Sequence, residues 1–192
     1  MLKQLGPAFR ITLVMTVLTG LVYPGLVTGL CQLLFHRRAN GSLVYVDGQA
    51  IGSTLIAQSF IKPEYFHPRP SVAGNGYDPT SSGGSNYGPT NQKLIDRVKV
   101  SIDAFRKENP DYTGPIPADL VTTSASGLDP DISPASANAQ AARVAKARGL
   151  SLAQVRQLIE QETESPTLGF IGEPRVNVLT LNLALDQQFP HR

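Results

Sequence analysis

An uncharged run near the N-terminus constrains this chain more than any other feature. From Ile11 to Phe35 the sequence reads ITLVMTVLTGLVYPGLVTGLCQLLF, 25 residues without a charged side chain. A helix of about 20 apolar residues crosses the hydrocarbon core of a bilayer, so this run suffices for a somewhat tilted span. It predicts a transmembrane helix at 11–35, an N-terminal tail at 1–10 and a soluble domain at 39–192.

Two cleaved signals compete with a retained anchor. A secretory signal peptide has a shorter apolar region ending at a small-x-small site, which Leu34 to Arg37 do not offer. A lipoprotein signal is approached at Thr28 to Cys31, but Leu30 stands where a small residue is required. A retained anchor is therefore favoured. Small residues let helices pack closely in a bilayer and proline permits a kink, roles that we assign to Gly20, Pro24, Gly25 and Gly29.

The charge distribution argues against a nucleic-acid partner. The net charge is +2, but 4 of the 17 basic residues flank the anchor: Lys3, Arg10, Arg37 and Arg38. The remaining 13 basic residues accompany all 15 acidic ones, which gives the rest of the chain a net charge of −2 without a basic cluster. The flanking charges nearly balance, so they leave the orientation in the membrane open. The partner predicted for the apolar segment at 11–35 is the lipid bilayer.

The soluble part mixes strand and helix patterns. Alternating apolar residues at 43–46 before Asp47-Gly48 predict a hairpin. Helical spacing at 94–105 predicts a helix that Thr90 or Asn91 caps and Pro110 ends. Ser133-Pro134 begins a second helix that ends at Gly149, with a thin apolar face at Ala137, Ala141, Val144 and Ala145, and Ser151 begins a third. The segment RVNVLTLNLALDQQF suits a strand and then a helix.

These patterns predict the α+β class: a single N-terminal transmembrane helix followed by one mixed α+β domain. In the Pro-rich stretch IKPEYFHPRPS, the rings of Phe60, Tyr65 and Phe66 either pack onto the hairpin, which we favour, or form a partner-binding edge. His67 is expected to make structural hydrogen bonds. Asp129-Pro130-Asp131 is expected to be a turn cap.

No enzyme motif is present. The single cysteine, Cys31, lies in the apolar run, and there is no CxxC or HxxxH pair that would predict a metal site. In SSGGSNYGPTNQ, residues 81–92, the first lysine after the glycines, Lys93, comes too late for a GxxxxGK[ST] phosphate loop. Its N–H groups precede a helix and either hold an anion or form a turn that contacts a partner.

Several blocks together carry a family resemblance. After the anchor come IAQSF, YFHPRPS, SSGGSNYGPTNQKL, TTSASGLDPDISPASANAQAARVA and GEPRVNVLTLNLALD. In this order they resemble the C subunit of the Kdp-type bacterial potassium-transporting ATPase, the KdpC family, over essentially the whole chain.

The resemblance implies a non-catalytic subunit of a potassium pump. Its partners would be a channel-like potassium-binding subunit and a catalytic P-type ATPase subunit. It would sit in the bacterial inner membrane with a cytoplasmic N-terminus and an extracytoplasmic domain. Its implied roles are to assemble and stabilise the pump, and to act as a catalytic chaperone that raises the ATP affinity of the catalytic subunit.

An alternative is a regulatory nucleotide-binding module with ATP as its ligand. The loop resembles the Ser-Gly-Gly core of the ABC-type ATPase signature at Ser82, Gly83, Gly84 and Ser85, with Asn86 next to them. Gln58, outside the loop, is a further candidate for nucleotide binding. We favour a turn that touches a partner, because the loop itself carries no charge to neutralise a triphosphate and a domain outside the cytoplasm would meet little ATP.

Overall fold

The computed structural model describes residues 2–190. The chain divides into two compact units, and the boundary along the sequence falls between Leu43 and Val44. Met1, His191 and Arg192, which the predicted tail and soluble domain include, lie outside the described residues.

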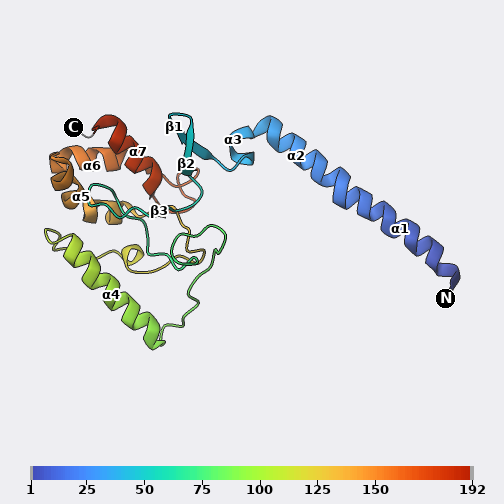
Figure 1. Cartoon of the computed structure of the whole chain (residues 1–192), viewed down its shortest axis with the longest axis horizontal. Coiled ribbons are helices and arrows are strands. Elements are labelled where there is room, and N and C mark those ends of the chain that lie inside the picture. Colours follow the sequence, from blue (N-terminus) through green and yellow to red (C-terminus); the bar gives the residue numbers. More distant parts are fainter. Residues whose placement is uncertain (1, 191–192) are drawn as a thin grey trace. The chain divides into compact units, whose positions relative to one another are not determined.

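The N-terminal unit is a long apolar helix (Figure 1). It runs for 30 residues from Leu5 to Leu34, none of which is buried, and an 18-residue window within it has a mean hydropathy of 1.8. The helix consists of α1 (Leu5–Val17), η2 (Leu18–Val22) and α2 (Tyr23–Leu34). The 3-10 turn η1 (Leu2–Gln4) precedes it, and the short helix α3 (His36–Ala39) follows it. It begins before the predicted Ile11 because Arg10 ends the uncharged run without interrupting the backbone hydrogen bonds. By length and composition it can cross a bilayer, as no other helix within 2–190 can.

The element η2 is a π-helical turn directly before Pro24. Proline has no N–H, so the Gly20 carbonyl loses the donor that a regular helix would supply four residues on. In η2 the Tyr23 N–H donates to the Leu18 carbonyl, five residues back. Proline at position 24 is predicted to permit a kink, and the irregularity that the helix shows there is a π-helical turn.

Two small sheets follow the apolar helix along the chain. The predicted hairpin is confirmed as β1 (Leu43–Val46) and β2 (Gln49–Ser53), with positive φ at Asp47 (51°) and Gly48 (79°). The other sheet has the antiparallel order β3 (Asp131–Ile132), β5 (Arg175–Asn177) and β4 (Thr163–Glu164). In it Val176 lies opposite Ile132 on one side and Thr163 on the other.

The three helices predicted after the hairpin are present, and two further helical elements accompany them. They are α4 (Gln92–Glu108), the 3-10 turn η3 (Ala118–Leu120), α5 (Pro134–Arg148), α6 (Leu152–Gln161) and α7 (Val178–Gln188). Asn91 caps α4 by accepting from the Lys93 N–H at 2.9 Å. Gly149 ends α5 in the left-handed region, and Ser151 opens α6 with a capping box. The α+β prediction is confirmed, and most of the closing segment is helix rather than strand.

The core lies between α5, α6 and α7. The predicted small face of α5 is buried, which lets its neighbours approach closely. The main members are Phe66, Ile132, Ala137, Ala141, Val144, Val155, Leu158, Ile159, Val176, Leu181 and Leu185. A smaller cluster joins α4 to α5 through Phe105 and Ala139. This cluster lies at the C-terminal end of α4, so the N-terminal half of that helix is less buried.

The aromatic residues of the Pro-rich stretch pack onto the helices, so the prediction that they cover the hairpin is wrong. The Phe66 side chain is fully buried in the α5–α7 core. Its backbone is held by Asn182 of α7, which accepts from the Phe66 N–H at 2.8 Å and donates to the Phe66 carbonyl at 3.0 Å. A buried amide that satisfies both backbone groups explains why this residue turns inward.

This pairing yields a stability prediction. Replacing Asn182 with Leu keeps the volume but leaves a buried N–H and a buried carbonyl without partners. We expect the free energy of unfolding to fall by about 2–4 kcal/mol, measured by urea denaturation of the full chain in detergent. The control Asn138→Leu, at an exposed position of α5, should change it by less than about 0.5 kcal/mol. Equal losses in the two variants would contradict this role of Asn182.

Candidate functional site

The glycine-rich loop at 81–92 lies against the segment 124–127. The Gly83 N–H donates to the Ser126 carbonyl at 2.8 Å. The Ser82 hydroxyl donates to the same carbonyl at 3.0 Å. One of the backbone N–H groups that an anion would need is therefore already bonded within the chain.

The two glycines of the loop have different surroundings. A Cβ on Gly84 would lie 2.7 Å from the Ala125 carbonyl oxygen, whereas a Cβ on Gly83 would meet nothing within 4 Å. Neither glycine has positive φ, and the left-handed residue of the loop is Asn86 at 51°. Gly84 is thus required by a close backbone approach.

A cation stands against the loop although the loop carries no charge of its own. Arg97 of α4 donates from Nη2 to the Ser85 hydroxyl at 3.0 Å. Its guanidinium carbon lies 5.4 Å from the centroid of the Tyr87 ring. Its Nε is buried and has no hydrogen-bond partner among residues 2–190. The fold therefore brings one positive charge to a loop that is neutral in sequence.

Gln58 is placed with the hairpin. Its Nε2 donates to the Ile51 carbonyl at 3.0 Å, and its side chain occupies the space that a Cβ on Gly52 would need. The neighbouring Ala57 N–H donates to the Leu128 carbonyl at 2.8 Å. Gln58 and the loop thus flank the same 124–128 segment, but within the described residues no hydrogen bond joins Gln58 to 82–86.

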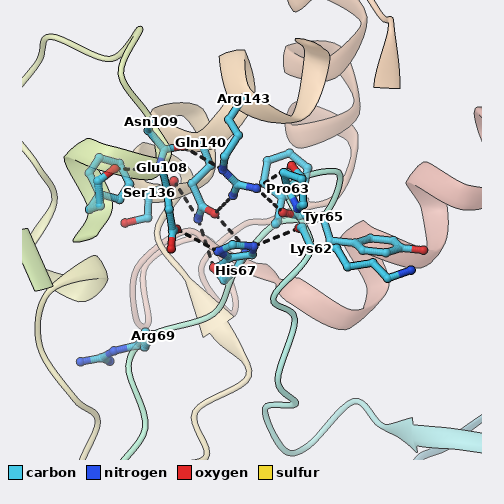
Figure 2. Close-up of polar contacts among 12 residues, drawn as sticks. Lys62, Pro63, Tyr65, His67, Arg69, Glu108, Asn109, Ser136, Gln140 and Arg143 are labelled. Atoms are coloured by element: carbon cyan, nitrogen blue, oxygen red, sulfur yellow. Dashed lines mark hydrogen bonds and ion pairs between the residues drawn. The ribbon is translucent and has the colours of Figure 1, made fainter. Parts of the chain in front are cut away.

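A buried polar network holds the Pro-rich segment in place, and Figure 2 shows Arg143 pointing from α5 into it. Arg143 donates to the Pro63 and Tyr65 carbonyls at 2.6 and 2.9 Å. It also donates to Asn109 Oδ1 at 3.0 Å and to Gln140 Oε1 at 2.7 Å. All four acceptors are uncharged oxygens around a side chain that is 8% exposed. Burial accordingly lowers the pKa of Arg143 below its usual value, against the attraction of Glu108.

Gln140 continues this network one residue along the segment. Its Oε1 accepts from the His67 N–H at 2.8 Å, and its Nε2 donates to the His67 carbonyl at 3.1 Å. Gln140 thus bonds both backbone groups of His67, just as Asn182 bonds both backbone groups of Phe66. Together with Arg143, they replace the strand partner that a segment with three prolines lacks.

His67 makes structural hydrogen bonds, as predicted. Its Nε2 lies 3.1 Å from the Lys62 carbonyl and its Nδ1 lies 3.3 Å from Glu108 Oε2. Burial, and then the charge of Arg143, lower the pKa of His67 below its usual 6.5, although Lys62 and Glu108 oppose that shift. A neutral ring facing a carbonyl carries its proton on Nε2, so His67 donates to the Lys62 carbonyl within its own segment. It bonds Glu108 at the end of α4 only when Nδ1 is protonated as well.

The Asp129-Pro130-Asp131 turn is confirmed as a cap. The Asp131 N–H donates to Asp129 Oδ1 at 3.1 Å. Arg69 pairs with Asp129 at 2.8 Å, and Arg175 pairs with Asp131 at 3.2 Å. Within 2–190 no group of three His, Cys, Asp or Glu residues is placed to hold a metal ion.

Sequence reasoning missed Gln140, Arg143 and Asn182. Their positions carried a usable signal, because Gln140 lies within the apolar stripe of α5 and Asn182 within that of α7. A polar side chain inside such a stripe either breaks the core or satisfies a buried backbone group. Which backbone it would meet depended on the tertiary structure.

The anchor glycines are uncovered by the chain itself. Outside the backbone of their own helix, a Cβ on Gly20, Gly25 or Gly29 would meet nothing within 4 Å. Gly25 and Gly29 are four residues apart in α2 and lie on one face. The two units define the class of protein: a chain with one candidate membrane-spanning helix followed by one small α+β domain.

Comparison with known proteins identifies the family. The family described as KdpC, K⁺-transporting ATPase, c chain, matches residues 5–187. A potassium-transporting ATPase KdpC subunit from Caulobacter sp. (strain K31) is 60% identical over 191 residues, covering 99% of this chain and 96% of the relative. Relatives of the same name from Koribacter versatilis and Rhodospirillum rubrum are each 56% identical, over 99% of this chain and 97% and 98% of their own lengths. The chain belongs to the KdpC family.

The loop geometry yields a prediction that separates the two glycines. Gly84→Ala places a methyl group against the Ala125 carbonyl, and we expect a loss of about 1–3 kcal/mol in unfolding free energy and faster proteolysis within 81–92. Gly83→Ala meets open space and should change stability by less than about 1 kcal/mol. Equal effects on stability and on proteolysis would show that the approach to Ala125 is not what requires glycine.

Proposed function

We propose that this chain is a non-catalytic subunit of a potassium-transporting ATPase complex, in which it assembles and stabilises the pump. The observation that carries the proposal is the anchor, a 30-residue helix that is long and apolar enough to cross a bilayer. In a bilayer, helix association depends on close packing at small residues. Gly25 and Gly29 offer such a face, and the relatives bear the name of a pump subunit.

In this proposal the N-terminus is cytoplasmic and the domain lies outside the cytoplasm of a bacterial cell. The partners are a channel-like potassium-binding subunit, beside which the domain lies, and a catalytic P-type ATPase subunit. The support is the family resemblance, because the charges flanking the anchor favour neither orientation. ATP hydrolysis belongs to the catalytic subunit, since this sequence has no phosphorylation motif of its own.

The anchor supplies the test. Replacing Gly25 and Gly29 with Leu fills the small face of α2, so we expect roughly tenfold less of the chain to co-purify with a tagged catalytic subunit from membranes. The matched control Val27→Leu changes an exposed residue away from that face and should assemble as the wild type does. Unchanged co-purification of the double variant, at equal expression, would refute packing through this face.

A regulatory nucleotide-binding module that acts through the glycine-rich loop is the second candidate, whereas a chaperone role toward the catalytic subunit belongs with the first. It is favoured by Arg97, a cation held against a glycine-rich loop that leads into α4. It is disfavoured because Arg97 already bonds Ser85 and the Gly83 N–H already bonds Ser126. A triphosphate would have to displace both interactions.

Calorimetry separates the two candidates. We expect no saturable heat when ATP, up to millimolar concentration, is titrated into the full chain in detergent. Saturable binding that is lost in Gln58→Ala, Ser85→Ala and Arg97→Gln would establish the nucleotide role instead. Binding that survives all three changes would place the nucleotide away from this loop.

A further inference from the structure

The turn between β4 and β5 presents three large apolar side chains to solvent. Leu168, Phe170 and Ile171 are 79%, 76% and 52% exposed. We call residues 166–172 the apolar tip. Single exposed apolar residues are ordinary on protein surfaces, but three within four positions form a patch that marks an interaction site.

Part of the backbone of the apolar tip is bonded from within. Thr167 and Ile171 exchange two N–H to carbonyl hydrogen bonds, each of 2.9 Å. The Gly169 N–H donates to the Pro166 carbonyl at 2.9 Å. These bonds give the turn a defined shape and do not depend on water, so they persist when the tip enters a recess.

Leu168 adopts an unfavourable backbone conformation that burial of its side chain does not offset. Its φ of 57° lies in the left-handed region, which bulky residues rarely occupy. The side chain gains no burial in return, since most of it is exposed. Strained residues of this kind cluster at sites that contact a ligand or partner.

The stem holds the apolar tip firmly on the domain. Val176 of β5 is fully buried in the core, and its neighbour Arg175 pairs with Asp131 at 3.2 Å and with Glu164 at 2.9 Å. The tip is therefore presented on the central strand of the sheet. A docking segment that is already ordered loses little conformational entropy when it binds.

The charges around the tip indicate what covers it. The tip has no charged residue. Glu173 follows it and forms no ion pair within the described chain, while Glu164 at the stem is neutralised by Arg175. Segments that enter a bilayer surface usually carry Lys or Arg toward anionic lipids, and the unpaired Glu173 opposes that. A protein surface with a basic group beside an apolar recess complements both features.

We propose that the apolar tip docks into an apolar recess of another subunit of the pump, with Phe170 as its central side chain and a basic group of that subunit facing Glu173. This inference rests on the proposed function and names the surface of the domain through which it acts. It is independent of the packing of the anchor.

Site-specific photo-crosslinking in the assembled complex tests the proposal. The full chain, carrying a benzophenone amino acid in place of Phe170, is expressed with the other pump subunits and irradiated in membranes. We expect a crosslink to a pump subunit at a yield at least about tenfold above that of Val100, a control position on α4 that is 67% exposed. Lipid adducts alone, or no protein crosslink from a complex that co-purifies intact, would overturn the proposal.

A substitution gives a second readout. Phe170→Ser should lower the fraction of chain retained on the tagged catalytic subunit after a detergent wash by about tenfold, while Val100→Ser leaves it unchanged. Normal retention of Phe170→Ser would refute docking through the tip while leaving assembly through the anchor intact. If the wild-type chain itself failed to co-purify, the proposed function would fail instead, so the two failures are distinguishable.

Discussion

The domain depends on how the Pro-rich segment satisfies its backbone. Pro63 and Pro68 lack the N–H donors that a strand would need, so residues 62–68 do not join a sheet. Side chains from two helices supply the partners: Arg143 for the Pro63 and Tyr65 carbonyls, Asn182 for Phe66 and Gln140 for His67. With its backbone bonded, Phe66 can fill the centre of the α5–α7 core.

This arrangement explains two features of α5. Its small face lets the neighbouring elements approach closely, and that same closeness brings Gln140 and Arg143 within reach of the segment. Arg143 is buried among neutral oxygens, so its charge is balanced by dipoles and by the nearby Glu108 rather than by a direct ion pair. Such a network is costly when incomplete and rigid when complete, so it holds the Pro-rich segment and the helices in one arrangement.

Within residues 2–190 the anchor and the apolar tip differ from the glycine-rich loop in how their surfaces are satisfied. The anchor needs lipid or other helices because its side chains are apolar along a length that can cross a bilayer. The loop is largely closed by its own bonds to Ser126 and Arg97, so it has the character of a folded turn. The tip is ordered and apolar, as expected of a contact surface in an assembly.

The sequence by itself determined the elements with local causes. The uncharged run specified the anchor, Asp47-Gly48 the hairpin, and Asn91, Ser133 and Gly149 the ends of helices, because turns and caps depend on neighbouring residues. Only the tertiary structure decided that Phe66 enters the helical core, that Arg97 reaches Ser85, and that Gln58 belongs to the hairpin. These pairings join residues from separate elements, and no local pattern records which distant side chain will satisfy a given backbone group or which loop a cation will meet.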